Sequence, residues 1–196
     1  MRVAAGTPGA SHDTRATIML ILVLGGSLAL NVRLGWKLRG LESTVAGLRT
    51  PYRLPSGVTL PPIPATDLGG KPAVITYAGY PPTVLYVFAP PCRWCARNLA
   101  NIQALASARG GTYRFVGLSL SDTGLREYVA ANNLRFPVYT RVAPEAIRAL
   151  RLGGTPHTLV VSSEGKLLKN WVGAYGNDLQ REIERYFDVR LPGLAR

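Results

Sequence analysis

Residues 84–109 read VLYVFAPPCRWCARNLANIQALASAR and decide the fold. The first six, residues 84–89, form a continuous apolar run, which is typical of a strand buried on both faces of a sheet. The last part, residues 96–109, repeats its large apolar residues every three or four positions and is followed by two glycines, a pattern that predicts a helix with a glycine end. A buried strand therefore passes directly into a helix, with Cys92 and Cys95 at the junction.

Cys92 is predicted to be a nucleophile because of this position. The N-terminus of a helix presents unpaired N–H groups and the positive end of its dipole, and both favour a thiolate over a thiol. Arg93 adds a positive charge and is expected to modulate the same equilibrium. Because the thiolate is the attacking species in thiol–disulfide exchange, we predict that Cys92 attacks and that Cys95, one turn later, resolves the mixed disulfide.

Other uses of two cysteines fit the sequence less well. A zinc site needs two more ligands, and the only histidines are His12 and His157, so no metal is expected. Covalent haem attachment needs a histidine where Ala96 stands, and no other cofactor is indicated. An inert structural disulfide is the plain alternative, although a strand-to-helix corner is an unusual place for one.

The rest of the second half alternates strands and helices. Further strands are expected at residues 115–120, 136–140, 158–161 and 167–172. Further helices are expected from a cap at Asp122 or Thr123 to residue 132, over residues 144–152, and from Asn177 or Asp178 to residue 187. This order predicts an α/β fold, a mixed sheet flanked by helices, over residues 66–190, with a short tail at residues 191–196.

An apolar segment near the N-terminus predicts a membrane anchor. Residues 16–32 carry no charge and would span roughly 26 Å as a helix, enough for the hydrocarbon core of a bilayer. We assign the transmembrane helix to residues 16–34, after a tail of residues 1–15. The alternatives are a cleaved signal peptide, with Ser27 and Ala29 at −3 and −1 of the cut, and a buried helix of a soluble protein.

Two segments connect the anchor to the domain. Residues 35–49 place leucine and valine at alternating spacings of four and three, which predicts a helical stalk, either a short coiled coil or an amphipathic helix lying on its own domain or on lipid. Residues 50–65 hold five prolines, which favour an extended, semi-rigid linker.

The charge distribution gives conflicting indications. More basic residues follow the span than precede it, which by the positive-inside rule places the domain in the cytoplasm. A tethered redox dithiol instead favours an oxidising compartment, so we expect a single-pass protein of the inner (cytoplasmic) membrane whose domain faces the periplasm or the outside. The formal net charge is +12, but the arginines are dispersed, so no nucleic-acid partner is expected.

The motifs together resemble a known family. The strand–CRWC–helix unit, GTPHT before the strand at 158–161, the hairpin EGK with NWVGAYG, and the lead-in LPPIPATDLGGKPAVITY are similar to the thioredoxin fold. Within it they resemble the membrane-tethered TlpA/ResA-like redoxins, which include the cytochrome c-maturation thioredoxins. The resemblance covers residues 58–190.

The resemblance implies further site residues. It puts Pro156 at the family's cis-proline position, with Thr155 and Pro156 facing Cys92, so that the main chain of Thr155 pairs with an extended substrate. Apart from the resemblance, Trp94 is expected to contact the substrate. His157 is expected either to face solvent in the loop or to modulate the thiolate.

The chain also departs from the family pattern. Pro91 stands where the family usually has a tryptophan, and a tryptophan, Trp94, stands between the cysteines instead. Tyr86 stands where thioredoxins have a buried carboxylate, which would take the proton of the resolving thiol. Glu145 and Glu164 are the remaining candidates for that base.

The leading function is therefore a membrane-anchored thiol–disulfide oxidoreductase. It is expected to reduce protein disulfides, among them those of apocytochromes, and to exchange electrons with a membrane redox partner. A redoxin-type thiol peroxidase is an alternative, although Ala89 stands where such sites have Thr or Ser. A non-catalytic tethered adaptor for an acidic partner is another.

Overall fold

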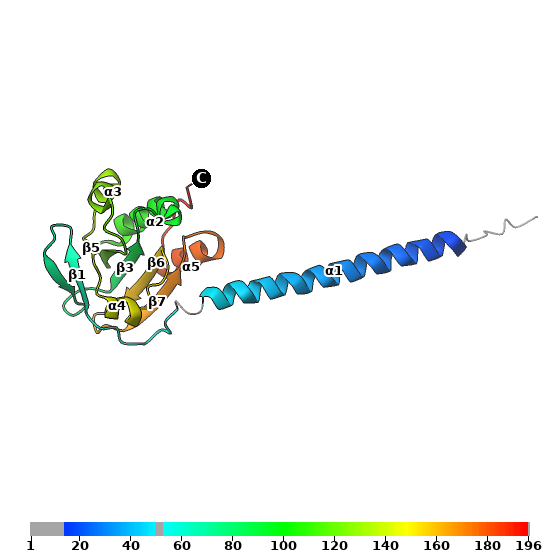
Figure 1. Cartoon of the computed structure of the whole chain (residues 1–196), viewed down its shortest axis with the longest axis horizontal. Helices are drawn as coiled ribbons and strands as arrows, with labels where there is room; N and C mark the ends of the chain where they lie inside the picture. Colours follow the sequence, from blue (N-terminus) through cyan, green and yellow to red (C-terminus); the bar gives the residue numbers. More distant parts are fainter. Residues whose placement is uncertain (1–13, 50–52, 196) are drawn as a thin grey trace, which may run out of the picture. The chain divides into compact units, whose positions relative to one another are not determined.

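The structure is a computed structural model that describes residues 14–49 and 53–195, so the predicted N-terminal tail lies almost entirely outside it. The chain divides into two compact units, Met1–Leu48 and Arg49–Arg196. The first is built on the single helix α1 (Thr14–Arg49), which runs through the segments assigned to the anchor and the stalk (Figure 1).

One part of α1 is long and apolar enough to cross a membrane. This part, Thr17–Lys37, has 21 residues and would extend over roughly 32 Å. Its apolar side chains are exposed rather than buried in a protein core, so length and composition allow a membrane span.

The second unit is built on one seven-stranded sheet in the order β2-β1-β5-β4-β3-β6-β7. The strands are β1 (Ile63–Asp67), β2 (Pro72–Ile75), β3 (Thr83–Phe88), β4 (Arg114–Ser119), β5 (Val138–Thr140), β6 (His157–Val161) and β7 (Leu167–Val172). The central strand β3 pairs in parallel with β4 and antiparallel with β6, so the predicted mixed sheet is confirmed.

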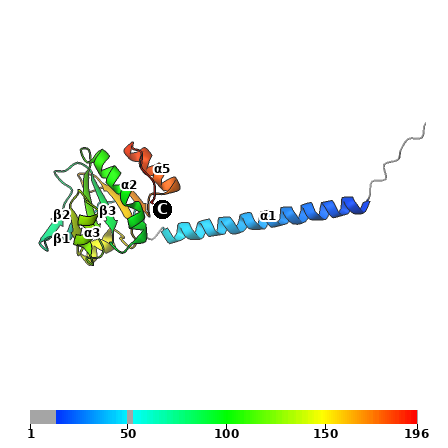
Figure 2. The same ribbon diagram turned by 90° about the horizontal axis from the view of Figure 1, so that it is seen from above.

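Helices cover both faces of this sheet, as expected. They are α2 (Arg93–Arg109), α3 (Leu125–Ala131), α4 (Pro144–Ala149) and α5 (Asn177–Phe187). Because side chains alternate along a strand, Val84, Tyr86 and Phe88 of β3 enter the core beneath α2 and α5, while Leu85 and Val87 enter the core beneath α4. Figures 1 and 2 both show α2 beside α5, and salt-bridged residues join their C-terminal ends.

Several boundaries differ from the sequence prediction. Helix α2 begins at Arg93 rather than residue 96, because the Cys92 side chain caps it. Neither Asp122 nor Thr123 caps α3; Gly124, in the left-handed conformation, precedes it, and Asp122 pairs with Arg141 instead. Helix α4 ends at Ala149, three residues early, with Leu150 as its C-cap.

From Gly57 onward, the proline-rich segment belongs to the folded domain rather than to a free linker. The N–H of Gly57 donates to the Leu167 carbonyl at 2.7 Å, and that of Leu60 donates to the Gly165 carbonyl at 2.8 Å. Leu60 and Ile63 are buried, and β1 and β2 form an antiparallel hairpin. The folded domain therefore begins at about Gly57, before the predicted start at residue 66, because the apolar residues between the prolines pack into its core.

Candidate active site

The two cysteines lie where β3 ends and α2 begins. Cys92 is the N-cap of α2, and its sulfur accepts a hydrogen bond from the backbone N–H of Cys95 at 3.2 Å. Both are free thiols; Cys92 is partly exposed, whereas Cys95 is fully buried in the core beneath α2. One sulfur is therefore open to a partner, and the other lies one turn behind it.

The surroundings separate the pKa values of the two thiols. Burial acts to raise the pKa of Cys92, but hydrogen bonds from Cys95, the Thr155 side chain and the Trp94 backbone outweigh it and leave this pKa below its ordinary value. The exposed Arg93 is not among these groups. Burial, with the adjacent Cys92 sulfur, raises the pKa of Cys95 to about 12. Cys92 therefore ionises first, and Cys95 keeps its proton near neutral pH.

The loop before β6 reaches the same sulfur. The Thr155–Pro156 peptide bond is cis, and the carbonyl oxygen of Thr155 lies 3.5 Å from Cys92 Sγ. Pro156 is buried, and its carbonyl accepts a hydrogen bond from the N–H of Gly173 at 2.8 Å. The fold thus brings together Cys92 and a loop that follows it by 63 residues.

His157 does not face solvent, which corrects one expectation. It is the first residue of β6, fully buried, and paired in register with Val87 and Val172. Its Nε2 lies 2.5 Å from Asn170 Oδ1, and burial lowers its pKa, so the ring is neutral. The strand begins one residue earlier than predicted, and the structure brings His157 to Asn170 rather than to the cysteines.

A buried polar network behind Cys95 was not foreseen. The side-chain oxygen Oδ1 of Asn98 accepts hydrogen bonds from the backbone N–H of Tyr175 at 2.9 Å and from Asn101 Nδ2 at 3.1 Å. The Tyr175 hydroxyl lies 2.6 Å from Thr158 Oγ1. The signal was present in the sequence: Asn98 and Asn101 follow Cys95 by three and six positions, which places all three on one helix face.

Tyr86 lies in the same buried region. Burial raises its pKa well above the ordinary value, and the charges of Tyr175 and Cys95 act in the same direction. The hydroxyl is therefore neutral, and it has no hydrogen-bond partner of normal geometry among the described residues. Glu145 and Glu164 are exposed, in α4 and in the turn after β6, and neither is among the main groups that shift the pKa of a cysteine.

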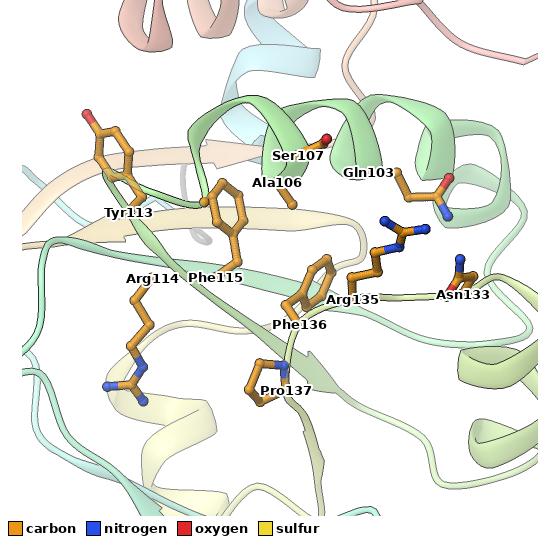
Figure 3. A pocket seen from close by; sticks show the side chains of 11 residues that line it. Gln103, Ala106, Ser107, Tyr113, Arg114, Phe115, Asn133, Arg135, Phe136 and Pro137 are labelled. Carbon is orange, nitrogen blue, oxygen red and sulfur yellow. The ribbon is translucent and has the colours of Figure 1, made fainter.

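A pocket of about 650 Å³ lies elsewhere on the domain (Figure 3). It is lined by the second half of α2, the start of β4 and the segment before β5. Phe115 and Phe136 supply its aromatic side chains together with Tyr113, and Arg135 points over it. No cysteine is among the residues that line this pocket, so it is separate from the thiol site.

Solved structures with known chemistry share this architecture, although no protein-family model and no curated protein matches the sequence. The thioredoxin domain of a thiol-disulfide oxidoreductase from Bacteroides vulgatus is 17% identical, with a TM-score of 0.58 over 69% of this chain and 99% of that one. StoA from Bacillus subtilis is 18% identical, with a TM-score of 0.52 over 65% and 98%. A secreted Mycobacterium tuberculosis disulfide oxidoreductase is 21% identical, with a TM-score of 0.53 over 64% and 93%. These likenesses confirm the predicted fold: the chain has a thioredoxin fold, with thiol-disulfide oxidoreductases among its structural neighbours, as the resemblance to TlpA/ResA-like redoxins implies.

Proposed function

We propose that the chain is a thiol–disulfide oxidoreductase in which Cys92 attacks and Cys95 resolves. The observation that carries this proposal is the division between the two thiols. Cys92 is partly exposed and has a lowered pKa, whereas Cys95 is buried and has a pKa of about 12. A nucleophile must be ionised and accessible, and only Cys92 meets both conditions.

The reaction transfers two electrons from the dithiol to the substrate. The Cys92 thiolate attacks one sulfur of a protein disulfide, the S–S bond breaks, and the departing thiolate takes up a proton. Cys95 then loses its proton and attacks Cys92 Sγ, which releases the second substrate thiol and leaves a Cys92–Cys95 disulfide. A dithiol must reduce this disulfide again for turnover, and we propose that a partner in the same membrane supplies it.

The loop opposite Cys92 supports a peptide substrate. The Thr155 carbonyl beside the sulfur offers a main-chain acceptor to an extended segment, which is how strand addition aligns a peptide. Trp94, in the first turn of α2, is exposed, and we expect its ring to contact the residues that flank the disulfide. Reduction of apocytochrome cysteines is one form of this reaction.

The test of this assignment is the pH dependence of alkylation by iodoacetamide. A lowered pKa means that the Cys92 thiolate persists to lower pH, so its alkylation rate should rise with a midpoint below that of free cysteine. At a pKa of about 12, only about one Cys95 in 10⁴ is ionised at pH 8, so Cys95 should stay unmodified. Peptide mapping after alkylation reads both sites, with unfolded protein as the control in which the two react alike. Equal reactivity in the folded chain would contradict the assignment.

The proposed location is outside the cytoplasm, with the chain anchored through residues 16–34. The apolar segment of α1 supports the anchor, and a structural neighbour is a secreted protein. Alkaline phosphatase, which is active only where its disulfides form, should be active when fused to the C-terminus of the full chain. The same chain fused to β-galactosidase is the control and should be inactive; the reverse pattern would place the domain in the cytoplasm.

A further inference from the structure

A tryptophan and two arginines lie in the first two turns of α2, the helix that Cys92 caps. Trp94 is 50% exposed, and the guanidinium carbon of Arg97 lies 5.0 Å from the centre of its ring, within the range of a cation–π interaction. Arg93 is exposed on the same two turns of α2. We call these three residues, Arg93, Trp94 and Arg97, the α2 face.

The C-terminal segment holds Arg97 in place. Arg97 Nε donates to the Ala195 carbonyl at 2.7 Å, and the N–H of Ala195 donates back to the Arg97 carbonyl at 3.0 Å. Two residues earlier, the N–H of Gly193 donates to Asn101 Oδ1 at 2.8 Å. Among the described residues these bonds engage Nε and not the two terminal nitrogens, which are suited to a bidentate carboxylate. Because Arg97 is already ordered, a ligand loses less entropy in binding it.

No acidic residue balances the α2 face within the described domain. Helix α2 contains three arginines and no acidic residue. The segments that border the cysteines, residues 89–91, 153–156 and 173–176, contain no charged residue. The ion pairs of the described residues are Arg109–Asp188, Arg141–Asp122, Lys169–Glu182 and Arg181–Asp178. Arg93 and Arg97 are therefore cations without an ion-pair partner among the described residues, in the first two turns of the helix that Cys92 caps.

We propose that the α2 face selects protein disulfides flanked by an acidic residue and an aromatic side chain, an inference that rests on the proposed function. A guanidinium group binds a carboxylate in a bidentate manner, and an aromatic side chain can stack on the exposed Trp94 ring. Complementary charge also accelerates encounter. Other polyanions, such as nucleic acid or anionic lipid, bring no disulfide to Cys92, so the occupant is a protein segment.

Two synthetic peptides test this selection. Each closes the same disulfide ring, with glutamate and phenylalanine beside the cysteines in one and lysine and serine in the other. The measurement is the rate of reduction by the reduced full chain, divided by the rate with dithiothreitol, which corrects for the peptides' own reactivity. We expect the corrected rate for the acidic, aromatic peptide to be about tenfold that of the other peptide at low salt. This ratio of the two rates should fall to about threefold as salt is raised, because salt screens the ion pair but not the stacking on Trp94.

Variants assign the selection to the α2 face. Arg97→Gln and Trp94→Ala should each lower the ratio of the two rates about threefold, and the ratio cancels any effect on Cys92 itself. Arg185→Gln is the matched control, because it removes the same charge at a different place. Arg185 lies in the last turn of α5, whose C-terminal end is joined by an ion pair to the end of α2 opposite Cys92. This variant should leave the ratio unchanged. Equal rates for both peptides, or an equal effect of Arg185→Gln and Arg97→Gln, would overturn the inference. If neither peptide oxidises Cys92, the proposed function itself is wrong.

Discussion

The Cys92→Ser chain is expected to reduce protein disulfides no faster than dithiothreitol does without the chain. A serine hydroxyl does not ionise near neutral pH, so the attacking group is lost. Cys95 cannot replace it, because it is fully buried and, at a pKa of about 12, only about one molecule in 10⁵ carries a thiolate at pH 7. The measurement is the initial rate of reduction of a protein disulfide with dithiothreitol as the electron source.

The same substitution should leave the fold intact, which makes the loss of activity interpretable. Cys92 caps α2 by accepting a hydrogen bond from the N–H of Cys95, and serine is among the preferred residues for that role. The melting temperature of the Cys92→Ser chain should therefore stay close to that of the unaltered chain. Activity equal to that of the unaltered chain, in a folded variant, would show that another group performs the attack.

The sequence carries enough information to predict the strand-to-helix unit. The apolar run of β3 is continuous because both faces of that strand are buried, and the periodicity of α2 reflects its one buried face. The cysteines lie between two strong patterns, so their position at the junction follows directly. The lead-in hairpin was harder to foresee, because prolines interrupt the segment before β1 and hide its pairing with β2.

Tertiary contacts decide the features that were missed. His157 follows a cis-proline and reads as a loop residue, yet pairing with β3 and β7 draws it into the sheet. Asn98 and Asn101 interrupt the apolar face of α2, and their partners, Tyr175 and Gly193, are 77 and 92 residues away. Local patterns do not record partners at such distances.

In the proposed mechanism, Tyr86 makes the resolving step by Cys95 chemically different from one assisted by a buried carboxylate. Its pKa is raised by burial, so the hydroxyl is neutral at physiological pH. A neutral phenol can donate a hydrogen bond to a thiolate but cannot take the proton of the Cys95 thiol. The first step needs no such group, because the environment of Cys92 already favours its thiolate. In this mechanism, attack on the substrate needs only the Cys92 thiolate, whereas resolution of the mixed disulfide needs Cys95.

Removal of Cys95 should consequently separate the two steps. The Cys95→Ser chain keeps the backbone N–H that donates to Cys92 Sγ at 3.2 Å, so Cys92 should remain a thiolate and attack the substrate. Without the second sulfur, the mixed disulfide cannot be resolved within the chain. We expect a covalent complex that accumulates to about one substrate per chain. Intact mass spectrometry and a non-reducing gel should detect it, and dithiothreitol should cleave it.

The unaltered chain and the Cys92→Ser/Cys95→Ser chain are the controls, and neither should accumulate the complex. Because position 95 is fully buried and an unpaired hydroxyl there costs about 1–3 kcal/mol, Cys95→Ala is the companion variant and should trap the same complex. If the complex formed equally well in the Cys92→Ser chain, Cys92 would not be the attacking residue. Rapid turnover by the Cys95→Ser chain, with no trapped species and no external thiol, would instead show that a single cysteine suffices, and the dithiol mechanism would fail.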